Sequence, residues 1–591
     1  MQSNKARSVT WGKTIFIGFL FFFSASLLFS APQKMSKDLI GNNGYDQVDV
    51  IVQFTQTPTA FEHQKVFDRG GTLKQTLGQF KGAAYRLPAY AIEDLSNDPE
   101  VVYVSPDRPL KGASNPAPAL VNDFHYLTIN ANYAASKGLY GAGIGVAVID
   151  SGIANVPDIT AKNVVYSQDF TGIGSTVDQY GHGTHVTGIL AGNGAESIGS
   201  AYNYTFMGAA DGVSLINLRV LDQNGAGNDS QVIAAIQEAI ALKSKYNIRV
   251  INLSLGRPVW ESYKVDPLCQ AVEQAWKAGI VVVVAAGNYG RDNNSGTNGY
   301  GTITAPGNDP YVITVGAMNS LGTSNRTVHY IASYSSKGPT LIDNVVKPDI
   351  VAPGNLMVSL YFPASTLNQN YPQFETPLTA YLQQRETGLS GSYFNLSGTS
   401  MATPEVSAAA ALMLEQTPAL TPDQVKARLM VNAFKGLVQS SVATDLATGQ
   451  TFDEQADVFT VGAGYLDIQA ALTNTQLAPA TVGSALSPIA VKGSNGSVTV
   501  VPNGSSILGG TSILWGTATN LWGSSILWGT GSETAESILW GTGSTLTSSS
   551  ILWGTASTSS DSILWGTSET QVDGSNVLFS STTGDITNDQ E

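Results

Sequence analysis

The stretch Asn395-Leu-Ser-Gly-Thr-Ser-Met-Ala-Thr-Pro404 decides how the rest of the chain is interpreted. Ser400 stands at its centre, and the small residues after it lead into a helical continuation at 407–414. A serine at a helix start exposes its hydroxyl, and the unpaired N–H groups there can hold a developing negative charge. These properties suit an acyl-transfer nucleophile. They equally suit a small-residue helix packed against a neighbour, so a base and an orienting acid must be found elsewhere.

Composition narrows the classes of function. The chain has 591 residues, too many for one hydrophobic core, so several domains are expected. Its net charge of −15 argues against nucleic-acid binding, which needs basic patches. The single cysteine, Cys269, excludes a disulfide framework within the chain and a cysteine-rich metal site.

Residues 1–31 are predicted to be a secretory signal peptide. Basic residues precede a short apolar run at 15–29, which falls short of the roughly 20 residues that a membrane-spanning helix needs. Cleavage is expected near Ser26 or Ala31, and the protein is expected to be secreted. An uncleaved N-terminal segment that anchors the protein in the membrane is the alternative.

Residues 46–110 are predicted to form a small α+β unit. Sequence patterns indicate strands at 48–54, 82–87 and 101–105, and helices at 60–77 and 91–95. This order suits a compact sandwich of one sheet and two helices. Because the unit lies between a leader and a Pro- and Ala-rich stretch at 111–125, interpreted as a linker, it is a candidate pro-domain.

Residues 126–475 are predicted to form an open α/β domain. Apolar runs without a polar face are typical of strands in a parallel sheet covered on both sides, and they occur at 145–149, 213–220, 248–253, 280–286 and 311–315. Helical spacing appears between them at 231–245 and 270–277. The pattern predicts a mostly parallel sheet with helices on both faces and right-handed crossovers.

From 478 to 591 the composition changes to Ser, Thr and Gly, and the motif Ser-Ile-Leu-Trp-Gly repeats. Its copies start at Ser512, Ser525, Ser537, Ser550 and Ser562. Each copy is one short strand and a turn, too small to fold alone, so stacked copies could form a solenoid-like array. A tail without fixed structure is the alternative.

Two polar residues follow strands of the predicted sheet, at the edge where ligands bind in open α/β folds. Asp150 ends the strand at 145–149, and Asn288 follows the strand at 280–286. A carboxylate there can orient an imidazole, and an amide can donate to an oxyanion. An Asx-turn and a loop cap are the structural alternatives.

The base must come from five histidines. His182 has a glycine on either side, which lets a backbone approach closely, and the helix predicted at 184–190 fixes its position. His182 and His185 could instead ligate a metal, although no third ligand of suitable spacing is nearby. His63 falls in the candidate pro-domain, His125 in the linker, and His329 has no catalytic context.

Three stretches together resemble the active-site signatures of subtilases, the subtilisin-like serine proteases. They are Val148-Ile-Asp-Ser-Gly152, Gly181-His-Gly-Thr-His-Val-Thr-Gly188 and Gly398-Thr-Ser-Met-Ala-Thr-Pro404, in that family's order. The resemblance implies that Asp150 orients the imidazolium, His182 is the general base and then acid, and Ser400 is the nucleophile. It also implies that Asn288 and the Ser400 N–H donate to the oxyanion.

The resemblance, which spans about 140–470, implies a substrate-binding cleft as well. Gly225, Ala226 and Gly227 match one wall, and Ser254, Leu255 and Gly256 match the other, so an extended peptide would bind between them as an added strand. The unit at 46–110 resembles the family's pro-domain, a folding aid and intramolecular inhibitor.

Three features depart from the family pattern, one of them Val406-Ser407 where Val-Ala is common. Glu405 stands where histidine is usual, one turn past Ser400, and could favour the helix N-terminus electrostatically. The stretch 357–393 is longer than the corresponding part of the family core and is expected to be a surface insertion near the nucleophile.

The expected chemistry needs no cofactor. Structural calcium is common in the family, and Asp169, Asp222 and Asp229 lie in loops, but no ligand set can be named.

The expected function is therefore a secreted, self-processing serine endopeptidase of a subtilisin-like fold, which acts on polypeptide substrates. Processing is expected between about Leu110 and Val121. One alternative is a catalytically silent subtilase scaffold that binds a cell surface or matrix through its Trp repeats. Another is an α/β-hydrolase esterase, but that class needs a Gly-x-Ser-x-Gly elbow and places its serine first in the triad.

Overall fold

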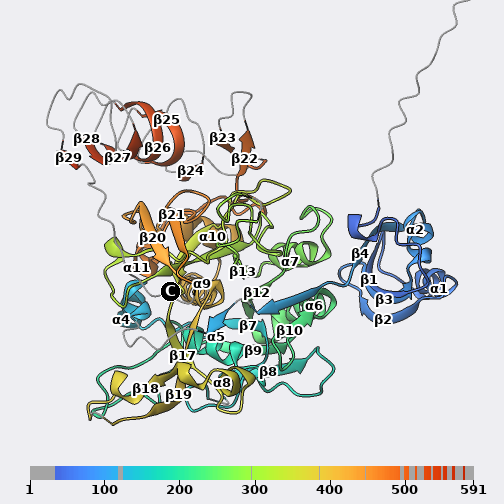
Figure 1. The fold of residues 1–591 in the computed structure, drawn as a ribbon, viewed down its shortest axis with the longest axis horizontal. Helices are drawn as coiled ribbons and strands as arrows, with labels where there is room; N and C mark the ends of the chain where they lie inside the picture. The colour runs from blue at the N-terminus through green and yellow to red at the C-terminus, as the bar shows by residue number, and fades with distance from the viewer. Residues whose placement is uncertain are drawn as a thin grey trace, which may run out of the picture.

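The computed structural model describes the chain from residue 34 to residue 579 with gaps. The described ranges are 34–112, 114–116, 124–160, 162–294, 296–384, 386–445, 448–492, 498–504, 513–515, 525–533, 537–546, 550–555, 562–565 and 577–579. The predicted signal peptide at 1–31 lies outside them. Figure 1 shows a small N-terminal domain joined by one extended segment to a large α/β domain, with the repeat strands at the far side of the large domain.

The N-terminal domain is a four-stranded antiparallel sheet with two helices and a core of its own. Its elements are η1 (Lys37–Leu39), β1 (Gln47–Phe54), α1 (Ala60–Phe67), β2 (Thr72–Leu77), β3 (Gly82–Pro88), α2 (Tyr90–Ser96) and β4 (Val101–Pro106). The strand order is β2-β3-β1-β4. The alternation of β1 places Val50 and Val52 in a core with Leu87 and Val104.

The helix predicted at 60–77 is wrong in its second half, where the chain forms strand β2. Gly70 adopts a φ of 78°, a left-handed conformation that ends α1. Gly71 packs so closely that a Cβ there would lie 2.5 Å from the Val66 side chain. The two glycines turn the chain, and the remaining residues pair with β3.

The large domain is built on an eight-stranded, mostly parallel sheet, as predicted. The order is β15-β14-β13-β11-β7-β9-β8, with β16 also paired to β14, and only β15 runs antiparallel. The strands are β7 (Gly145–Asp150), β8 (Val164–Asp169), β9 (Ser214–Arg219), β11 (Ile248–Leu253), β13 (Val281–Ala285), β14 (Ile313–Asn319), β15 (Tyr330–Ile331) and β16 (Ile350–Pro353). Their central members are buried throughout, which is why they appear as continuous apolar runs.

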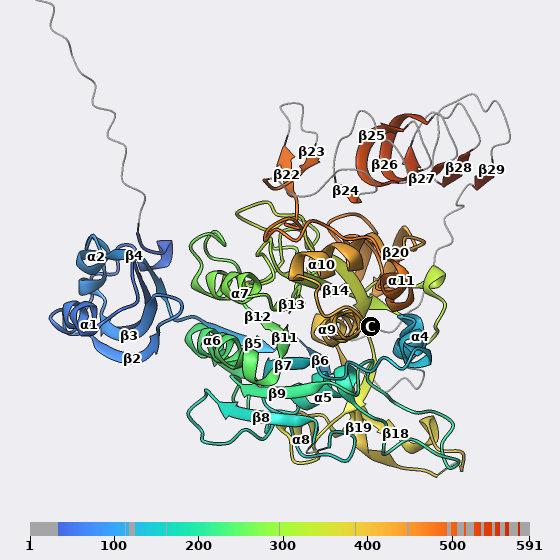
Figure 2. The same ribbon diagram turned by 180° about the vertical axis from the view of Figure 1, so that it is seen from behind.

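Helices cover both faces of this sheet. In Figure 2 the central strands lie between α6 (Asp229–Tyr246) and α7 (Pro267–Lys277) on one side and α9 (Thr399–Gln416) on the other. The short helix α5 (His182–Ala191) packs against α9. The nucleophile and base predicted from the sequence therefore stand at the first turns of two neighbouring helices.

The stretch predicted as a linker contains two strands. β5 (Pro109–Gly112) pairs antiparallel with β10 (Ala226–Asn228) on one side and β12 (Leu255–Gly256) on the other. β6 (Asn115–Pro116) pairs with β19 (Leu389–Ser397). His125 is also not in a linker, because it begins helix α3 (His125–Thr128). The segment that leaves the N-terminal domain thus threads between two strands of the large domain.

The insertion at 357–393 folds into a second small sheet. Strands β17 (Met357–Leu360) and β18 (Glu375–Pro377) pair with β19, which leads to Ser400. Helix α8 (Thr366–Asn370) contacts the loop before His182, since the Thr366 and Leu367 N–H groups donate to the Gln179 and Tyr180 carbonyls. The insertion therefore supports both the strand that leads to Ser400 and the segment before His182.

The remaining elements close the large domain and form the tail. They are α4 (Ala131–Ser136), η2 (Arg326–Val328), η3 (Pro372–Phe374), η4 (Leu378–Ala380), α10 (Pro422–Val431), β20 (Ser440–Thr444), β21 (Thr451–Gln455), α11 (Ile468–Thr473), β22 (Ile489–Lys492) and β23 (Val498–Val501). Ser487, before β22, donates to Asp349 inside the large domain at 2.5 Å. The start of the predicted tail is thus docked on the large domain.

The repeats form a six-stranded parallel sheet in which equivalent residues stand side by side. The strands are β24 (Ile513–Trp515), β25 (Ser525–Glu533), β26 (Ser537–Leu546), β27 (Ser550–Thr555), β28 (Ser562–Trp565) and β29 (Val577–Phe579). Trp528 pairs with Trp540, and Trp540 with Trp553. This is the stacked arrangement that the 12- to 13-residue period favours. No helix in the described ranges is long and apolar enough to cross a membrane.

Candidate active site

Asp150 and His182 form a buried pair at the carboxyl edge of the sheet. Asp150 is the last residue of β7, and His182 is the first of α5. His182 Nδ1 donates to Asp150 Oδ1 at 2.7 Å, and the Ser151 N–H donates to the same oxygen at 2.7 Å. His182 Nε2 is buried and has no partner among the described residues. The pair leaves that nitrogen available to accept a proton.

Asp178 fixes the start of α5. Its carboxylate accepts from the Gly181 and Thr184 N–H groups and from the Thr184 hydroxyl, each at 2.7 Å. It also accepts from the Ser151 hydroxyl at 2.8 Å, which ties the loop after β7 to the helix. Sequence analysis gave Asp178 no role. The sequence feature that could have revealed this role is a carboxylate shortly before a predicted helix start, because such carboxylates often accept from the first N–H groups of a helix.

The two histidines of α5 have opposite electrostatic environments. Burial alone would lower the pKa of His182, but the Asp150 carboxylate outweighs it and holds that pKa above its ordinary value. Burial lowers the pKa of His185 to about 3. His185 Nε2 donates to the Phe394 carbonyl at 3.0 Å. His185 is therefore a neutral packing residue, and the predicted alternative of a shared metal site has no support from this geometry.

Ser400 is fully buried on the first turn of α9. Its hydroxyl donates to the Ser254 carbonyl at 2.8 Å, while the Ser254 hydroxyl donates to the Ser400 carbonyl at 2.9 Å. These two hydrogen bonds join Ser400, the predicted nucleophile, to Ser254, a predicted substrate-binding residue. The described conformation contains no hydrogen bond between Ser400 and His182, so the hydroxyl must rotate away from Ser254 to reach the imidazole.

Asn288 is held beside Ser400 by its neighbour Thr399. The Thr399 N–H and hydroxyl donate to Asn288 Oδ1 at 2.9 and 3.0 Å. With its oxygen engaged in this way, the amide has its NH₂ group left to donate elsewhere. Thr399 was not singled out by sequence analysis, because only the fold brings residues 111 positions apart into contact.

The chain itself occupies the cleft between the two predicted substrate walls. Gly227 of β10 pairs with Leu110, and Leu255 of β12 pairs with Gly112. A Cβ on Gly112 would lie 3.3 Å from His182 Nδ1, so this residue touches the imidazole. On the other side of the site, Asn115 pairs with Ser397, three residues before Ser400. Gly112 and Asn115 therefore lie on either side of the site.

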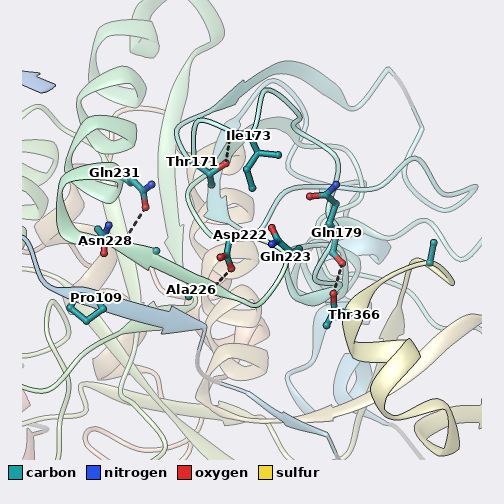
Figure 3. Close-up of a pocket in the computed structure, with 12 residues that line it drawn as sticks. Pro109, Thr171, Ile173, Gln179, Asp222, Gln223, Ala226, Asn228, Gln231 and Thr366 are labelled. Carbon is teal, nitrogen blue, oxygen red and sulfur yellow. Dashed lines mark hydrogen bonds between the residues drawn. The ribbon is translucent and has the colours of Figure 1, made fainter. Parts of the chain in front are cut away.

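A cavity of about 820 Å³ opens beside this cleft. Figure 3 shows the side chains around it, drawn from β5, β10, the segment before His182 and the insertion. They belong to Pro109, Thr171, Ile173, Gln179, Asp222, Gln223, Ala226, Gly227, Asn228, Gln231, Ala364 and Thr366. Asp222 is the single ionisable group in this lining. Two of its lining residues, Pro109 of β5 and Gly227 of β10, also belong to the strands at the cleft.

The three carboxylates considered for calcium are engaged by the chain's own donors. Two of them are not in loops as expected, because Asp169 ends β8 and Asp229 begins α6. Asp169 accepts from Thr171 and Gly174, and Asp222 accepts from the Asn224 and Ala226 N–H groups. Asp229 is paired with Arg257 at 2.8 Å. Across the described ranges, no three His, Cys, Asp or Glu side chains cluster as metal ligands. These three residues therefore do not fit a calcium site as they stand.

Glu405 has a partner that sequence analysis missed. It is fully buried on α9, and its Oε1 lies 2.5 Å from His125 Nδ1. The two residues are 280 positions apart, and a pattern read along the chain carries no signal for such a pair. Glu405 thus anchors the segment that follows the cleft-crossing strand, in addition to standing one turn past Ser400.

Comparisons with known proteins agree with this architecture. The subtilase family profile matches residues 141–464. Serine protease AprX of Bacillus subtilis (strain 168) is 37% identical over 297 residues, which are 49% of this chain and 60% of that protein. Subtilisin E of the same organism is 33% identical over 467 residues, which are 78% of this chain and 99% of that protein.

A solved structure shares the fold. Fervidolysin from Fervidobacterium pennivorans, a keratinolytic enzyme related to subtilisin, superposes with a TM-score of 0.55 at 21% identity. The match covers 78% of this chain and 64% of that one. The family profile, the relatives and the mostly parallel sheet lead to one conclusion: the chain belongs to the subtilase family, the subtilisin-like serine proteases.

Proposed function

We propose that this chain is a secreted serine endopeptidase, made as a self-processing zymogen, that hydrolyses peptide bonds through an acyl-enzyme. The observation that carries the proposal is the buried Asp150–His182 pair with a chain segment seated against it between β10 and β12. A non-catalytic binding protein would not need an imidazole that is paired with a carboxylate through Nδ1 and can accept a proton at Nε2.

In the proposed mechanism His182 Nε2 takes the proton of the Ser400 hydroxyl as its oxygen attacks the scissile carbonyl carbon. The negative oxygen of the tetrahedral intermediate accepts from the Ser400 N–H and the Asn288 amide. His182 then gives the proton to the departing amine, which leaves an ester on Ser400. Water then attacks this ester while His182 Nε2 takes its proton. His182 returns that proton to the Ser400 oxygen as the ester bond breaks and the acid product leaves. Asp150 stabilises the imidazolium in both steps.

The proposed substrate-binding residues are Gly225, Ala226, Gly227, Ser254, Leu255 and Gly256. Support comes from β5, whose pairing with Gly227 and Leu255 is what an extended polypeptide would make in the same place. Backbone pairing of this kind gives affinity without a required side chain, so a range of polypeptide substrates is expected.

The N-terminal domain is proposed to act as the intramolecular inhibitor. The Asp107 carboxylate accepts from the Ser230 N–H at 2.9 Å, at the first turn of α6, where a negative charge is favoured. Because Gly112 and Asn115 lie on either side of the site, self-cleavage is proposed between these two residues. The cleavage window expected from the sequence, 110–121, contains both.

Ser400→Ala in the full chain tests the proposal. The expected result is an unprocessed precursor that does not cleave casein, whereas wild type is processed and active. If the variant matured alone and cleaved casein, the assignment would be wrong.

The competing proposal is a catalytically silent scaffold that contacts a surface or matrix through β24–β29, and only the parallel pairing of the Trp repeats favours it. It predicts that wild type also remains uncleaved and inactive.

A further inference from the structure

Arg108 occupies a buried polar site at the edge of the cleft. Its side chain is 5% exposed, although it belongs to the segment that enters β5. Its Nη1 donates to Glu261 Oε1 at 2.7 Å, and its Nη2 donates to Glu261 Oε2 at 2.9 Å. The guanidinium carbon also lies 5.9 Å from the centre of the Trp260 ring. A bidentate carboxylate and an aromatic face are the two groups that recognise a guanidinium best.

The partners of Arg108 come from two parts of the chain that cleavage would separate. Ser36 and Asp38 belong to the N-terminal domain and accept from the same Nη2. Trp260 and Glu261 belong to the catalytic domain, four and five residues after β12 ends. A mature enzyme without its pro-domain would therefore keep the bidentate carboxylate and the aromatic ring.

Glu261 depends on the cleft-entering segment for its pairing. Within the described ranges its side chain has hydrogen-bond partners only in Ser36 and Arg108. The nearby Arg257 does not neutralise it, because that guanidinium donates to Asp229 and Asp266 at 2.9 Å each. Release of the pro-domain would leave a carboxylate beside the cleft with no cation on it.

The strand register shows which residue of a bound substrate would reach this site. β12 pairs with Gly112 and Lys111, and the chain after β12 runs on past Arg108 to Glu261. A polypeptide bound like β5 would bring the residue four positions before its imidazole-contacting residue to the same point. Lys111, also on this strand, is exposed and makes no ion pair within the described part of the chain.

We propose that Trp260 and Glu261 form a guanidinium subsite of the mature protease, which favours polypeptide substrates with arginine four residues before the residue that contacts His182. This inference rests on the endopeptidase function proposed above. Lysine serves less well there, since a single ammonium cannot make the paired contacts with one carboxylate. The subsite holds the substrate in the ground state and the transition state alike, so it acts chiefly on KM.

The test uses mature enzyme prepared from the full chain and a peptide with the sequence of residues 105–120. Replacing Arg108 by citrulline or glutamine in the peptide should lower kcat/KM about tenfold, mainly through KM, as expected for loss of a charge-assisted hydrogen-bond pair. The matched control is Lys111→Gln in the peptide, which removes the same charge without a partner and should change kcat/KM less than twofold.

The enzyme variant Glu261→Gln should cleave the arginine and citrulline peptides equally, while Asp453→Asn, an exposed carboxylate on β21, should keep the arginine preference. Equal cleavage of both peptides by wild type would overturn the inference, and so would a casein-active enzyme that ignores the whole peptide. A Glu261→Gln variant with altered self-processing but unchanged peptide preference would mean that Glu261 serves only the precursor. A wild-type protein that does not cleave casein would instead refute the proposed function.

Discussion

Gly112 lies against the imidazole of His182, so closely that an added Cβ would be 3.3 Å from Nδ1. The contact places the chain's own backbone in the proposed substrate cleft, and it limits the side chain at this position. Gly112→Ile should therefore slow conversion of the precursor by roughly tenfold, the cost of overpacking a tight contact. The measurement is the rate at which the precursor band disappears during refolding.

The control for that variant is Lys111→Ile, at an exposed position of the same strand. It adds a β-branched side chain without approaching the imidazole, so processing should proceed at the wild-type rate. Equal slowing by both variants would show that strand pairing, and not the His182 contact, limits the conversion.

Asn288→Ala should reduce kcat about 10²- to 10³-fold with little change in KM, because its amide is proposed to donate only when the oxyanion forms. Thr399→Val tests the support of that amide. It removes the hydroxyl that donates to Asn288 Oδ1 at 3.0 Å and keeps the N–H that donates at 2.9 Å. Steady-state kinetics on one peptide measure both, and a larger effect of Thr399→Val than of Asn288→Ala would contradict the assignment.

The pH profile should report the Asp150–His182 pair. Burial by itself would lower the pKa of His182, but the Asp150 carboxylate holds it above its ordinary value. Since His182 must be neutral to accept a proton, kcat/KM should fall as the pH drops through this raised pKa, with a midpoint above about 6.5.

Asp150→Asn should move that midpoint to lower pH and reduce kcat by about 10⁴-fold, because the imidazolium loses its counter-charge and orientation. The measurement is kcat/KM of both proteins from about pH 5 to pH 9. A midpoint that stays in place when Asp150 is replaced would show that another group controls the acid limb.

His125→Ala should destabilise the catalytic domain by about 3 kcal/mol, because it removes a partner from the fully buried carboxylate of Glu405. Urea unfolding in the Ser400→Ala background avoids self-digestion. A double-mutant cycle with Glu405→Ala is the control, and additivity within about 0.5 kcal/mol would contradict the pairing.

Sequence patterns predicted the parts of the fold that depend on local order. Buried parallel strands such as β11 and β13 are continuous apolar runs, and α6 shows helical spacing along its length, so each was found close to its observed bounds. The helix predicted at 60–77 failed because a pair of glycines outweighs an apolar period that continues through them.

Contacts between segments far apart in the sequence could not be predicted from the order of apolar and polar residues. β5 pairs through its backbone, so no side-chain rule marks Lys111 and Gly112 as a strand. The Arg108–Glu261 and His125–Glu405 pairs join residues 153 and 280 positions apart. Asp150, His182, Asn288 and Ser400 were named from short signatures. Asp178, which fixes the helix start at His182, and Thr399, which holds the Asn288 amide, became visible only in the folded chain.

The proposed role of Ser400 is tested most directly by mass spectrometry of the full chain after treatment with a fluorophosphonate, which reacts with activated serine hydroxyls. We expect one adduct per processed chain, mapped to the peptide that carries Ser400, and its loss in Asp150→Asn. No adduct on active, processed protein, or an adduct on a serine other than Ser400, would contradict it.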